Sequence, residues 1–269
     1  GKWQDLKFTA AEQRDFIKAA LGPALRAANA TAHLDLLMLD DQRIHLGAWT
    51  DAVLGDPDAA QYVAGVALHW YAATEDLTPS ALYFGEMDTA HAKYGHAAYM
   101  FATEACEGFL PWSKGPYPGD WGRAETYAHD ILGDLNHWAE GWTDWNAWLD
   151  ATGGPNWADN EVDAPIIVDA ADHFYKQPMY YAMAHFSKYV TPGSRRIKVT
   201  STATGVGRSP MECGAFLRPD GLVALVVLNR GHLQLGKGAT TQYSVQVGAA
   251  RWINLDVPAH SFQTILVKP

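Results

Sequence analysis

Residues 97–106 form the run AAYMFATEAC, which is mostly apolar and carries one carboxylate, Glu104, near its end. A short apolar run of this kind is typical of a strand buried within a parallel sheet. A carboxylate at such a strand end loses hydration unless it is hydrogen-bonded or used in chemistry. Glu104 is therefore a candidate functional residue, and the alternative is a strand-end glutamate that faces water or pairs with an arginine.

Three further runs repeat this pattern. They are HLDLLMLDD (33–41), VAGVALHWY (63–71) and GWTDWN (141–146). Segments with helical features separate the strands, at 46–62, 79–95 and 121–139. Strand and helix thus alternate four times, which predicts βα units around a parallel sheet. No glycine-rich phosphate loop follows any strand, so we expect half of a (β/α)8 barrel rather than a nucleotide-binding sheet.

The remaining segments have other patterns. Residues 8–28 predict a helix with a capping box, Thr9 and Glu12, and a kink or break at Pro23. Residues 147–165 lack periodicity and predict a long loop, and 172–189 predict a last helix. After about residue 193 the chain predicts an antiparallel β-sandwich, with strands at 195–203, 222–229, 241–247 and 261–267.

The bulk composition excludes several classes of protein. The 269 residues carry a net charge of −10, which argues against nucleic acid as a partner. No apolar run is long enough to span a bilayer, and the first five residues do not resemble a signal peptide. The two cysteines, Cys106 and Cys213, are expected to be free thiols. No motif for a metal, a serine nucleophile or an organic cofactor occurs, so we expect none of these.

Polar and aromatic side chains gather at the predicted strand ends. His69 and Tyr71 end the strand before Glu104, where they either hold a carboxylate ionised or cap the core as an aromatic cluster. Asp144-Trp145-Asn146 and the loop after it combine indole rings with amides, which suits the apolar faces and hydroxyls of a sugar.

These segments resemble the glucosylceramidases of glycoside hydrolase family 30. The runs that carry the resemblance are LLMLDDQR (36–43), HWY (69–71), EAC (104–106), GWTDWN (141–146), GGPNW (153–157), PIIVD (165–169) and FYKQPM (174–179). The resemblance implies that residues 1–192 form strands 5–8 of the barrel and that residues 193–269 form the β-sandwich domain.

The resemblance also assigns roles to residues. The nucleophile of a retaining β-glucosidase falls on Glu104, with Thr103 in place of the family's serine. The tryptophan that floors the glucose subsite falls on Trp145, and an asparagine that reaches the sugar falls on Asn160. His69 and Tyr71 match residues that flank the nucleophile, and a glycosylation site falls on the Asn29-Ala30-Thr31 sequon.

One motif of the family is missing. Its acid/base glutamate lies in an Asn-Glu-Pro sequence, and the chain has only Asn160-Glu161-Val162. We therefore expect the N-terminal half of the same enzyme, cleaved or continuous, to supply that acid, and we expect this chain alone to be inactive. Hydrogen bonds from groups such as Tyr71 and His69 are expected to keep the pKa of Glu104 low.

The implied substrate is glucosylceramide or a related β-glucoside, and the implied location is the lysosome or the outside of the cell. A saposin-like activator and an anionic membrane surface are further implied partners. The competing hypotheses are a relative that acts on β-xylosides or other glucosides, and a non-catalytic sugar-binding or structural protein on the same scaffold.

Overall fold

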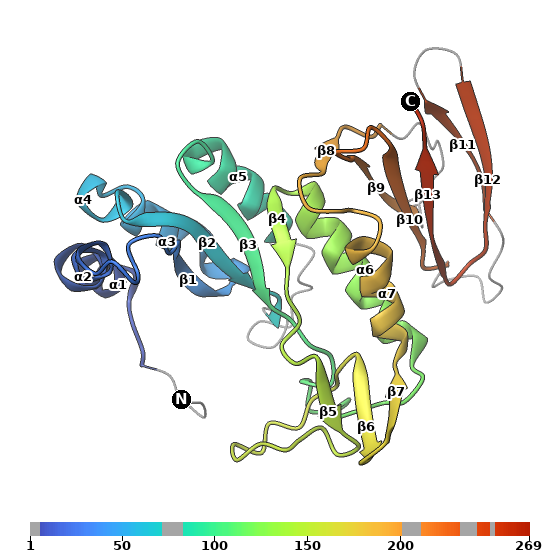
Figure 1. Cartoon of the computed structure of the whole chain (residues 1–269), viewed down its shortest axis with the longest axis horizontal. Coiled ribbons are helices and arrows are strands. Elements are labelled where there is room, and N and C mark those ends of the chain that lie inside the picture. The colour runs from blue at the N-terminus through green and yellow to red at the C-terminus, as the bar shows by residue number, and fades with distance from the viewer. Residues whose placement is uncertain (1–5, 72–82, 201–210, 232–240, 248–250) are drawn as a thin grey trace. The chain divides into compact units, whose positions relative to one another are not determined.

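The computed structural model describes residues 6–71, 83–200, 211–231, 241–247 and 251–269 (Figure 1). The chain divides into two compact units, which are described one at a time. The first unit contains residues 1–115, 133–146 and 153–162, and the second contains the remainder.

The first unit is built on a parallel sheet. Its strands lie in the order β1 (Leu36–Gln42), β2 (Val63–His69), β3 (Tyr99–Glu104) and β4 (Ala139–Trp142). Each neighbouring pair is parallel, which confirms the four parallel strands predicted from the sequence. The carboxyl ends of the strands therefore meet at one edge of the sheet (Figure 1).

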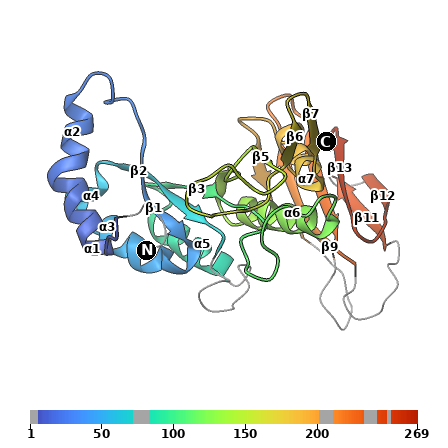
Figure 2. The same cartoon turned by 90° about the horizontal axis from the view of Figure 1, so that it is seen from below.

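Helices connect these strands. They are α3 (Leu46–Val53) and α4 (Pro57–Ala60) after β1, α5 (Phe84–Tyr94) after β2, and α6 (Trp121–Asn136) after β3. The segment with helical features at 46–62 thus forms two helices, and the start of the helix predicted at 79–95 lies outside the described residues. Helices α3 and α5 lie along β1 and β2 (Figure 2). Buried side chains of these helices form one core with those of the two strands, including Leu46, Met87, Met38 and Leu68.

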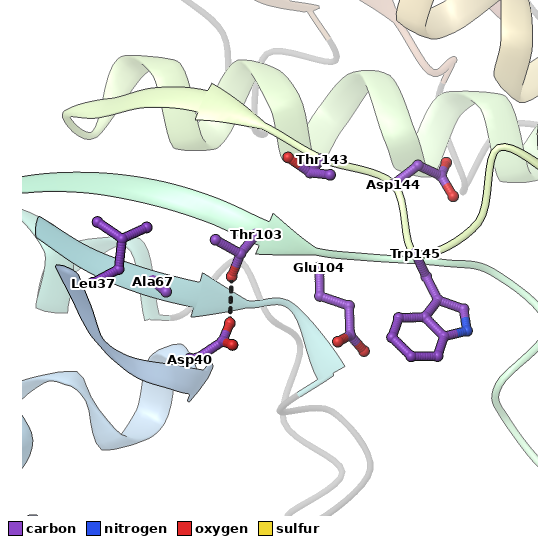
Figure 3. Close-up of a pocket in the computed structure, with 8 residues that line it drawn as sticks. All are labelled: Leu37, Asp40, Ala67, Thr103, Glu104, Thr143, Asp144 and Trp145. Atoms are coloured by element: carbon purple, nitrogen blue, oxygen red, sulfur yellow. Dashed lines mark hydrogen bonds between the residues drawn. The ribbon is translucent and has the colours of Figure 1, made fainter. Parts of the chain in front are cut away.

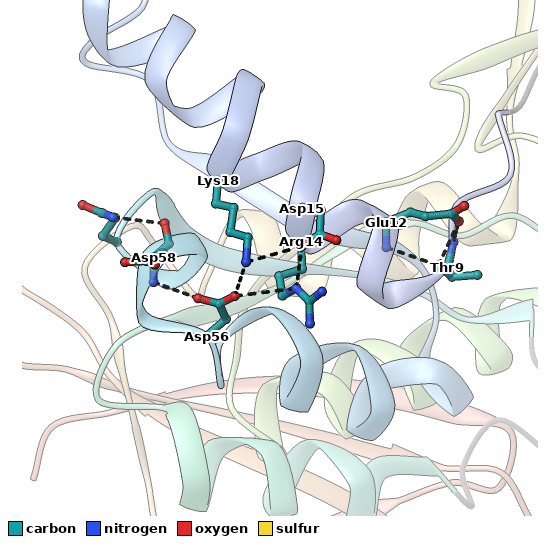
Figure 4. A network of polar contacts seen from close by, with 8 residues as sticks. Thr9, Glu12, Arg14, Asp15, Lys18, Asp56 and Asp58 are labelled. Carbon is teal, nitrogen blue, oxygen red and sulfur yellow. Dashed lines mark hydrogen bonds and ion pairs between the residues drawn. The ribbon is translucent and has the colours of Figure 1, made fainter.

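The N-terminal helical segment is continuous through Pro23. It consists of α1 (Ala10–Phe16), a π-helical turn (Ile17–Leu21) and α2 (Gly22–Ala27). The predicted capping box is present, and Pro23 follows directly on the π-helical turn as the second residue of α2. The Lys18 ammonium lies 2.7 Å from the Asp56 carboxylate at the start of α4, which ties the two helices together (Figure 4).

The second unit contains a small mixed sheet that the sequence did not predict. Strand β5 (Trp148–Asp150) pairs in parallel with β6 (Ile166–Ala170), which pairs antiparallel with β7 (His173–Lys176). The predicted loop at 147–165 therefore begins with a strand, and the helix predicted at 172–189 starts later, as α7 (Pro178–Ser187). These strands have three to five residues and lack alternation, so their signal was too short to find.

The C-terminal strands of the second unit are antiparallel, as predicted. One sheet has the order β13 (Ser261–Val267), β10 (Val223–Asn229), β9 (Met211–Leu217) and β8 (Arg195–Ile197). A second, two-stranded sheet contains β11 (Thr241–Val247) and β12 (Arg251–Val257). Val257 of β12 packs with Ala215 and Leu225 of the larger sheet, so the two sheets share a core.

Strands β9 and β12 were not predicted. The end of the strand predicted at 195–203 lies outside the described residues. No helix in the described part of the chain is long and apolar enough to cross a membrane.

A buried ion pair in the first unit ties α6 to the 3-10 turn (Arg43–His45) that precedes α3. Arg43 Nη2 lies 2.6 Å from Asp134 Oδ1, and the two side chains are 1% and 0% exposed. The Arg43 guanidinium also lies over the Phe84 ring, 4.9 Å from its centroid.

We predict that Asp134→Asn lowers the free energy of unfolding by about 3–5 kcal/mol, because it leaves a buried guanidinium without its carboxylate. Chemical denaturation of the intact protein measures the change. Asp51→Asn is the matched control, since Asp51 pairs with Lys93 at 2.5 Å but is 57% exposed. The control should lose at most about 1 kcal/mol. Equal losses in the two variants would contradict the prediction.

Candidate active site

Glu104 lies at the carboxyl end of β3 and lines an open cavity of about 330 Å³ (Figure 3). Its side chain is 26% exposed. The cavity is within the size range of small-molecule sites. It is lined by Leu37, Asp40, Ala67, Thr103, Glu104, Thr143, Asp144 and Trp145, all from the first unit. Every strand of the parallel sheet or the segment that follows it thus contributes to one site.

Trp145 reaches the cavity because pairing between β3 and the β4 segment continues beyond the strands. The amide of Thr143 donates to the carbonyl of Ala102, and the amide of Trp145 donates to that of Ala105, both at 2.8 Å. These bonds fix the Trp145 backbone beside the chain that carries Glu104. The indole is half-exposed and lies next to the Glu104 side chain (Figure 3). The structure therefore brings together the predicted carboxylate and the predicted aromatic platform.

His69 lies between two carboxylates. Its Nε2 is 2.9 Å from Asp40 Oδ1 and 3.7 Å from Glu104 Oε2. Burial lowers the pKa of His69, but the hydrogen bond to Asp40 and the charges of Glu104, Asp40 and Asp41 outweigh it. The pKa of His69 is therefore raised, which favours the imidazolium.

Tyr71 is a second neighbour of Glu104. Its hydroxyl donates to Cys106 Sγ at 3.2 Å, and its ring packs edge-on against Phe109, with centroids 4.8 Å apart. Burial is the main cause that raises the pKa of the Tyr71 hydroxyl, so the phenol keeps its proton and remains a donor. Burial likewise raises the pKa of Cys106, which keeps the thiol neutral.

The pKa of Glu104 is raised, contrary to the low value expected from the sequence. Burial is the largest cause, and the charges of Asp40 and Asp41 act in the same direction. The charge of His69 and a hydrogen bond from Tyr71 lower the pKa, as predicted, but they do not outweigh the loss of hydration. The sequence identified the correct stabilising neighbours and underestimated the cost of burial.

Asp40 is a site residue to which the sequence assigned no role, although Asp40 and Asp41 end one of the predicted strands. Its Oδ1 accepts a hydrogen bond from Thr103 Oγ1 at 2.8 Å (Figure 3). The same oxygen lies 2.9 Å from His69 Nε2. The strand register shifts between Leu39 and Asp41, and both Leu39 and Asp40 have positive φ, 72° and 58°. Such conformations cost about 1–3 kcal/mol each and tend to occur at functional sites. Paired acids at the end of an apolar strand were the available signal.

The two other predicted residues lie elsewhere in the first unit. Asn160 is held in its loop by Asn156, which accepts from the Asn160 amide at 2.7 Å and donates to its carbonyl at 3.0 Å. Asn160 is not among the residues that line the cavity. Asn29 is exposed in the turn after α2, where the Thr31 hydroxyl donates to the carbonyl of Leu25.

No group of three or more histidine, cysteine or acidic side chains in the described ranges has the arrangement of a metal site. The cavity offers the Glu104 carboxylate and an indole face, and beside that carboxylate lie an imidazole whose protonated form is favoured and a protonated phenol. This set can attack, stabilise or bind an uncharged ring that carries hydroxyl groups.

Two family models match the chain. Residues 1–190 match the glycosyl hydrolase family 30 TIM-barrel domain, and residues 193–265 match the family 30 beta sandwich domain. The chain belongs to glycoside hydrolase family 30. The resemblance and the fold class predicted from the sequence, a TIM-barrel domain followed by a β-sandwich, are confirmed.

Named relatives share much of this sequence. The chain is 46% identical over 229 residues to lysosomal acid glucosylceramidase of Mus musculus, which covers 85% of the chain and 42% of the relative. It is 44% identical over 233 residues to putative glucosylceramidase 4 of Caenorhabditis elegans, with 86% and 43% covered. The chain thus spans less than half the length of these relatives.

Among solved structures, the fold is similar to that of SrfJ from Salmonella typhimurium, with a TM-score of 0.81 and 25% identity. That match covers 97% of this chain and 53% of the other. The endo-β1,6-glucanase BT3312 is similar with a TM-score of 0.78 and 26% identity, and 98% and 55% of the two chains are covered.

The raised pKa of Glu104 predicts a pH-dependent effect on stability. Because the folded state binds the proton more tightly than the unfolded state, the ionised carboxylate destabilises the fold. This cost is absent below the ordinary glutamate pKa of about 4.3 and develops as pH rises through the raised folded value. Glu104→Gln should therefore melt at a higher temperature than the wild-type protein at pH 7, with no difference below about pH 4.

Scanning calorimetry of the intact protein at the two pH values measures this difference. Glu161→Gln is the control, since Glu161 is about half exposed and pairs with Lys114 on the surface. A destabilised Glu104→Gln at pH 7 would show that ionised Glu104 is better stabilised than its surroundings indicate.

Proposed function

We propose that this chain forms the nucleophile-bearing part of a retaining β-glucosidase that cleaves glucosylceramide-type β-glucosides. The observation that carries the proposal is the Glu104 carboxylate at a strand end, beside the Trp145 indole in a cavity of about 330 Å³. Membership of glycoside hydrolase family 30 and the glucosylceramidase names of relatives at 44–46% identity support it.

In the proposed reaction, a Glu104 oxygen attacks the anomeric carbon of the glucoside. A C–O bond to Glu104 forms while the bond to the leaving-group oxygen breaks, and an acid gives that oxygen its proton. Water, deprotonated by the same group, then attacks the anomeric carbon and releases glucose and the Glu104 carboxylate. Two inversions retain the β configuration.

The acid/base group is proposed to come from polypeptide outside these residues. A retaining site needs its two carboxyl groups about 5–5.5 Å apart. The chain has no Asn-Glu-Pro sequence, and Glu161 of its Asn-Glu pair binds Lys114 instead. We therefore propose the N-terminal half of the same enzyme as the partner, either cleaved and bound or continuous with this chain. A saposin-like activator and an anionic membrane surface are further proposed partners.

The proposed domain division is 1–192 for strands 5–8 of the catalytic barrel and 193–269 for the β-sandwich. The two family models meet at the same place, between residues 190 and 193. Within the barrel part, Trp145 is proposed to stack on the glucose ring and Asn160 to reach its hydroxyls from the long loop. His69 and Tyr71 are proposed to contact Glu104 and the sugar.

A second candidate is hydrolysis of other β-glucosides. The chain is 27% identical over 220 residues to endo-1,6-β-D-glucanase BGN16.3 of Trichoderma harzianum, which is a more distant relative. Comparing kcat/KM for glucosylceramide, a β-1,6-linked glucan and a β-xyloside distinguishes these activities. The non-catalytic alternative, a sugar-binding or structural protein, predicts no turnover of any of them.

The proposed location is the lysosome or the outside of the cell. The Asn29 side chain is exposed in a turn, as attachment of a glycan requires. We predict that the Asn29 peptide loses mass when the protein from its source is treated with an enzyme that removes N-linked glycans. Asn29→Gln should abolish this loss at that peptide. An unmodified Asn29 peptide in the untreated protein would argue against the secretory route.

We predict that an activated 2-fluoroglucoside or a cyclophellitol-type epoxide forms a covalent adduct at Glu104 in the intact protein. Mass spectrometry of proteolytic peptides locates the adduct. Glu104→Gln should remove the adduct and lower kcat about 10⁴-fold or more, the scale expected when a nucleophile is lost. An intact assembly that forms no adduct would favour the non-catalytic alternative.

Trp145→Ala provides a matched variant for the same experiment. It keeps the nucleophile but removes the stacking surface, so labelling at Glu104 should still occur and should need more reagent. Trp148→Ala removes an exposed indole that does not line the cavity and should label like the wild type. Equal labelling of the two variants would argue against stacking on Trp145.

A further inference from the structure

Asp40 and His69 form a polar pair at the edge of the candidate site. The Asp40 carboxylate lies within hydrogen-bond distance of His69 Nε2, at 2.9 Å, and it also accepts from the Thr103 hydroxyl. The same His69 nitrogen lies 3.7 Å from Glu104, which is too long for a hydrogen bond but close enough for strong attraction between charges. His69 is thus hydrogen-bonded to Asp40, and it acts on Glu104 through its charge.

We propose that Asp40 is a positioning residue that keeps His69 protonated and in place while the charge of Glu104 changes during the reaction. The proposal rests on the proposed function, because it assumes that Glu104 is the nucleophile. It adds a residue and a role that the nucleophile assignment does not contain.

The backbone around Asp40 supports a dedicated role. Asp40 is the extra residue of a bulge, since Leu39 pairs with Ala67 and Asp41 pairs with Leu68 on the neighbouring strand. A bulge in a parallel strand is rare and re-aims a side chain. The amide of Leu39 is held by Gln13 Oε1 at 3.0 Å, so contacts outside β1 maintain the strained turn. The result is that Asp40 lines the cavity wall with Thr103 (Figure 3).

The chemical reason is that Glu104 is charged for only part of the cycle. As a carboxylate it helps to hold the proton on His69, but as a glycosyl ester it is neutral. Asp40 keeps its negative charge throughout, so the imidazolium persists in the ester state. When water displaces the ester, the charge of His69 stabilises the departing Glu104 carboxylate. No proton moves between these residues in either step.

The charged and titratable groups that face His69 are Asp40 and Asp41 on β1 and Glu104 on β3. The Tyr71 ring lies edge-on to the imidazole, with ring centroids 6.2 Å apart. The hydrogen bond with Asp40 raises the pKa of His69 more than the charge of Asp41 does. Asp41→Asn is therefore a matched control that removes one negative charge but keeps the bond.

The test compares Asp40→Asn and Asp41→Asn in the intact protein. With ¹³C-labelled histidine, and with His69→Gln to assign the signal, NMR titration should show that the pKa of His69 falls more in Asp40→Asn. With an activated aryl glucoside, Asp40→Asn should release a burst of aglycone and then turn over about 10- to 100-fold more slowly, the range for loss of an outer partner. On the alkaline side of the pH–activity profile, Asp40→Asn should lose activity at a lower pH than the wild-type protein does.

Thr103 provides a second pair of variants if Asp40→Asn fails to fold. Thr103→Val removes the other donor to Asp40 and should shift the His69 titration in the same direction by a smaller amount, and Thr103→Ser should restore it. An unchanged His69 titration in Asp40→Asn would overturn the proposal, as would a raised KM without a burst. Failure of the epoxide to label wild-type Glu104 would reject the proposed function instead, and the His69 titration would still report whether Asp40 holds the proton.

Discussion

The site depends on the cost of burying one carboxylate. Glu104 is mostly removed from water at the tip of β3, and this loss of hydration is the largest influence on its pKa. Because an unpaired buried charge is expensive, the neighbouring strands must provide compensation. They do so with the charge of His69 and a hydrogen bond from Tyr71, at and just after the end of β2, whereas Asp40 and Asp41 on β1 act against the ionised carboxylate. The polar constellation is therefore a consequence of placing a carboxylate where an apolar strand ends.

The parallel sheet makes this compensation geometrically possible. Parallel strands bring all their carboxyl ends to one edge, so residues that are about 30 positions apart in sequence become neighbours. His69 and Glu104 occupy paired positions on β2 and β3. Hydrogen bonds from Thr143 and Trp145 extend the sheet beyond the last strand and carry the indole to the carboxylate. Rigid backbone pairing, rather than a mobile loop, fixes the spacing of these groups.

The sequence predicted the features that depend on pattern. Apolar runs predicted the four parallel strands, and the position of Glu104 at the end of one run made it a candidate functional residue. The bulge at Leu39 and Asp40 could not be predicted, because positive φ at a leucine has no signal in composition or periodicity. Strand β5 was missed since three residues are too few for a period. The predicted direction of the Glu104 pKa shift was wrong, because burial depends on packing that the sequence does not give.

The raised pKa of Glu104 also bears on the roles of the nucleophile and the acid/base group in the proposed mechanism. In a retaining site the nucleophile must ionise before its partner, and the ionised nucleophile then raises the pKa of that partner by repulsion. Within this chain the groups that favour ionised Glu104 are His69 and Tyr71. Asp40 in turn raises the pKa of His69 and so favours its protonated form. Asp40 itself acts against Glu104 by direct repulsion. Its net benefit therefore requires that attraction by the imidazolium at 3.7 Å outweighs repulsion by Asp40, and the charge of His69 does have the larger influence on the pKa of Glu104.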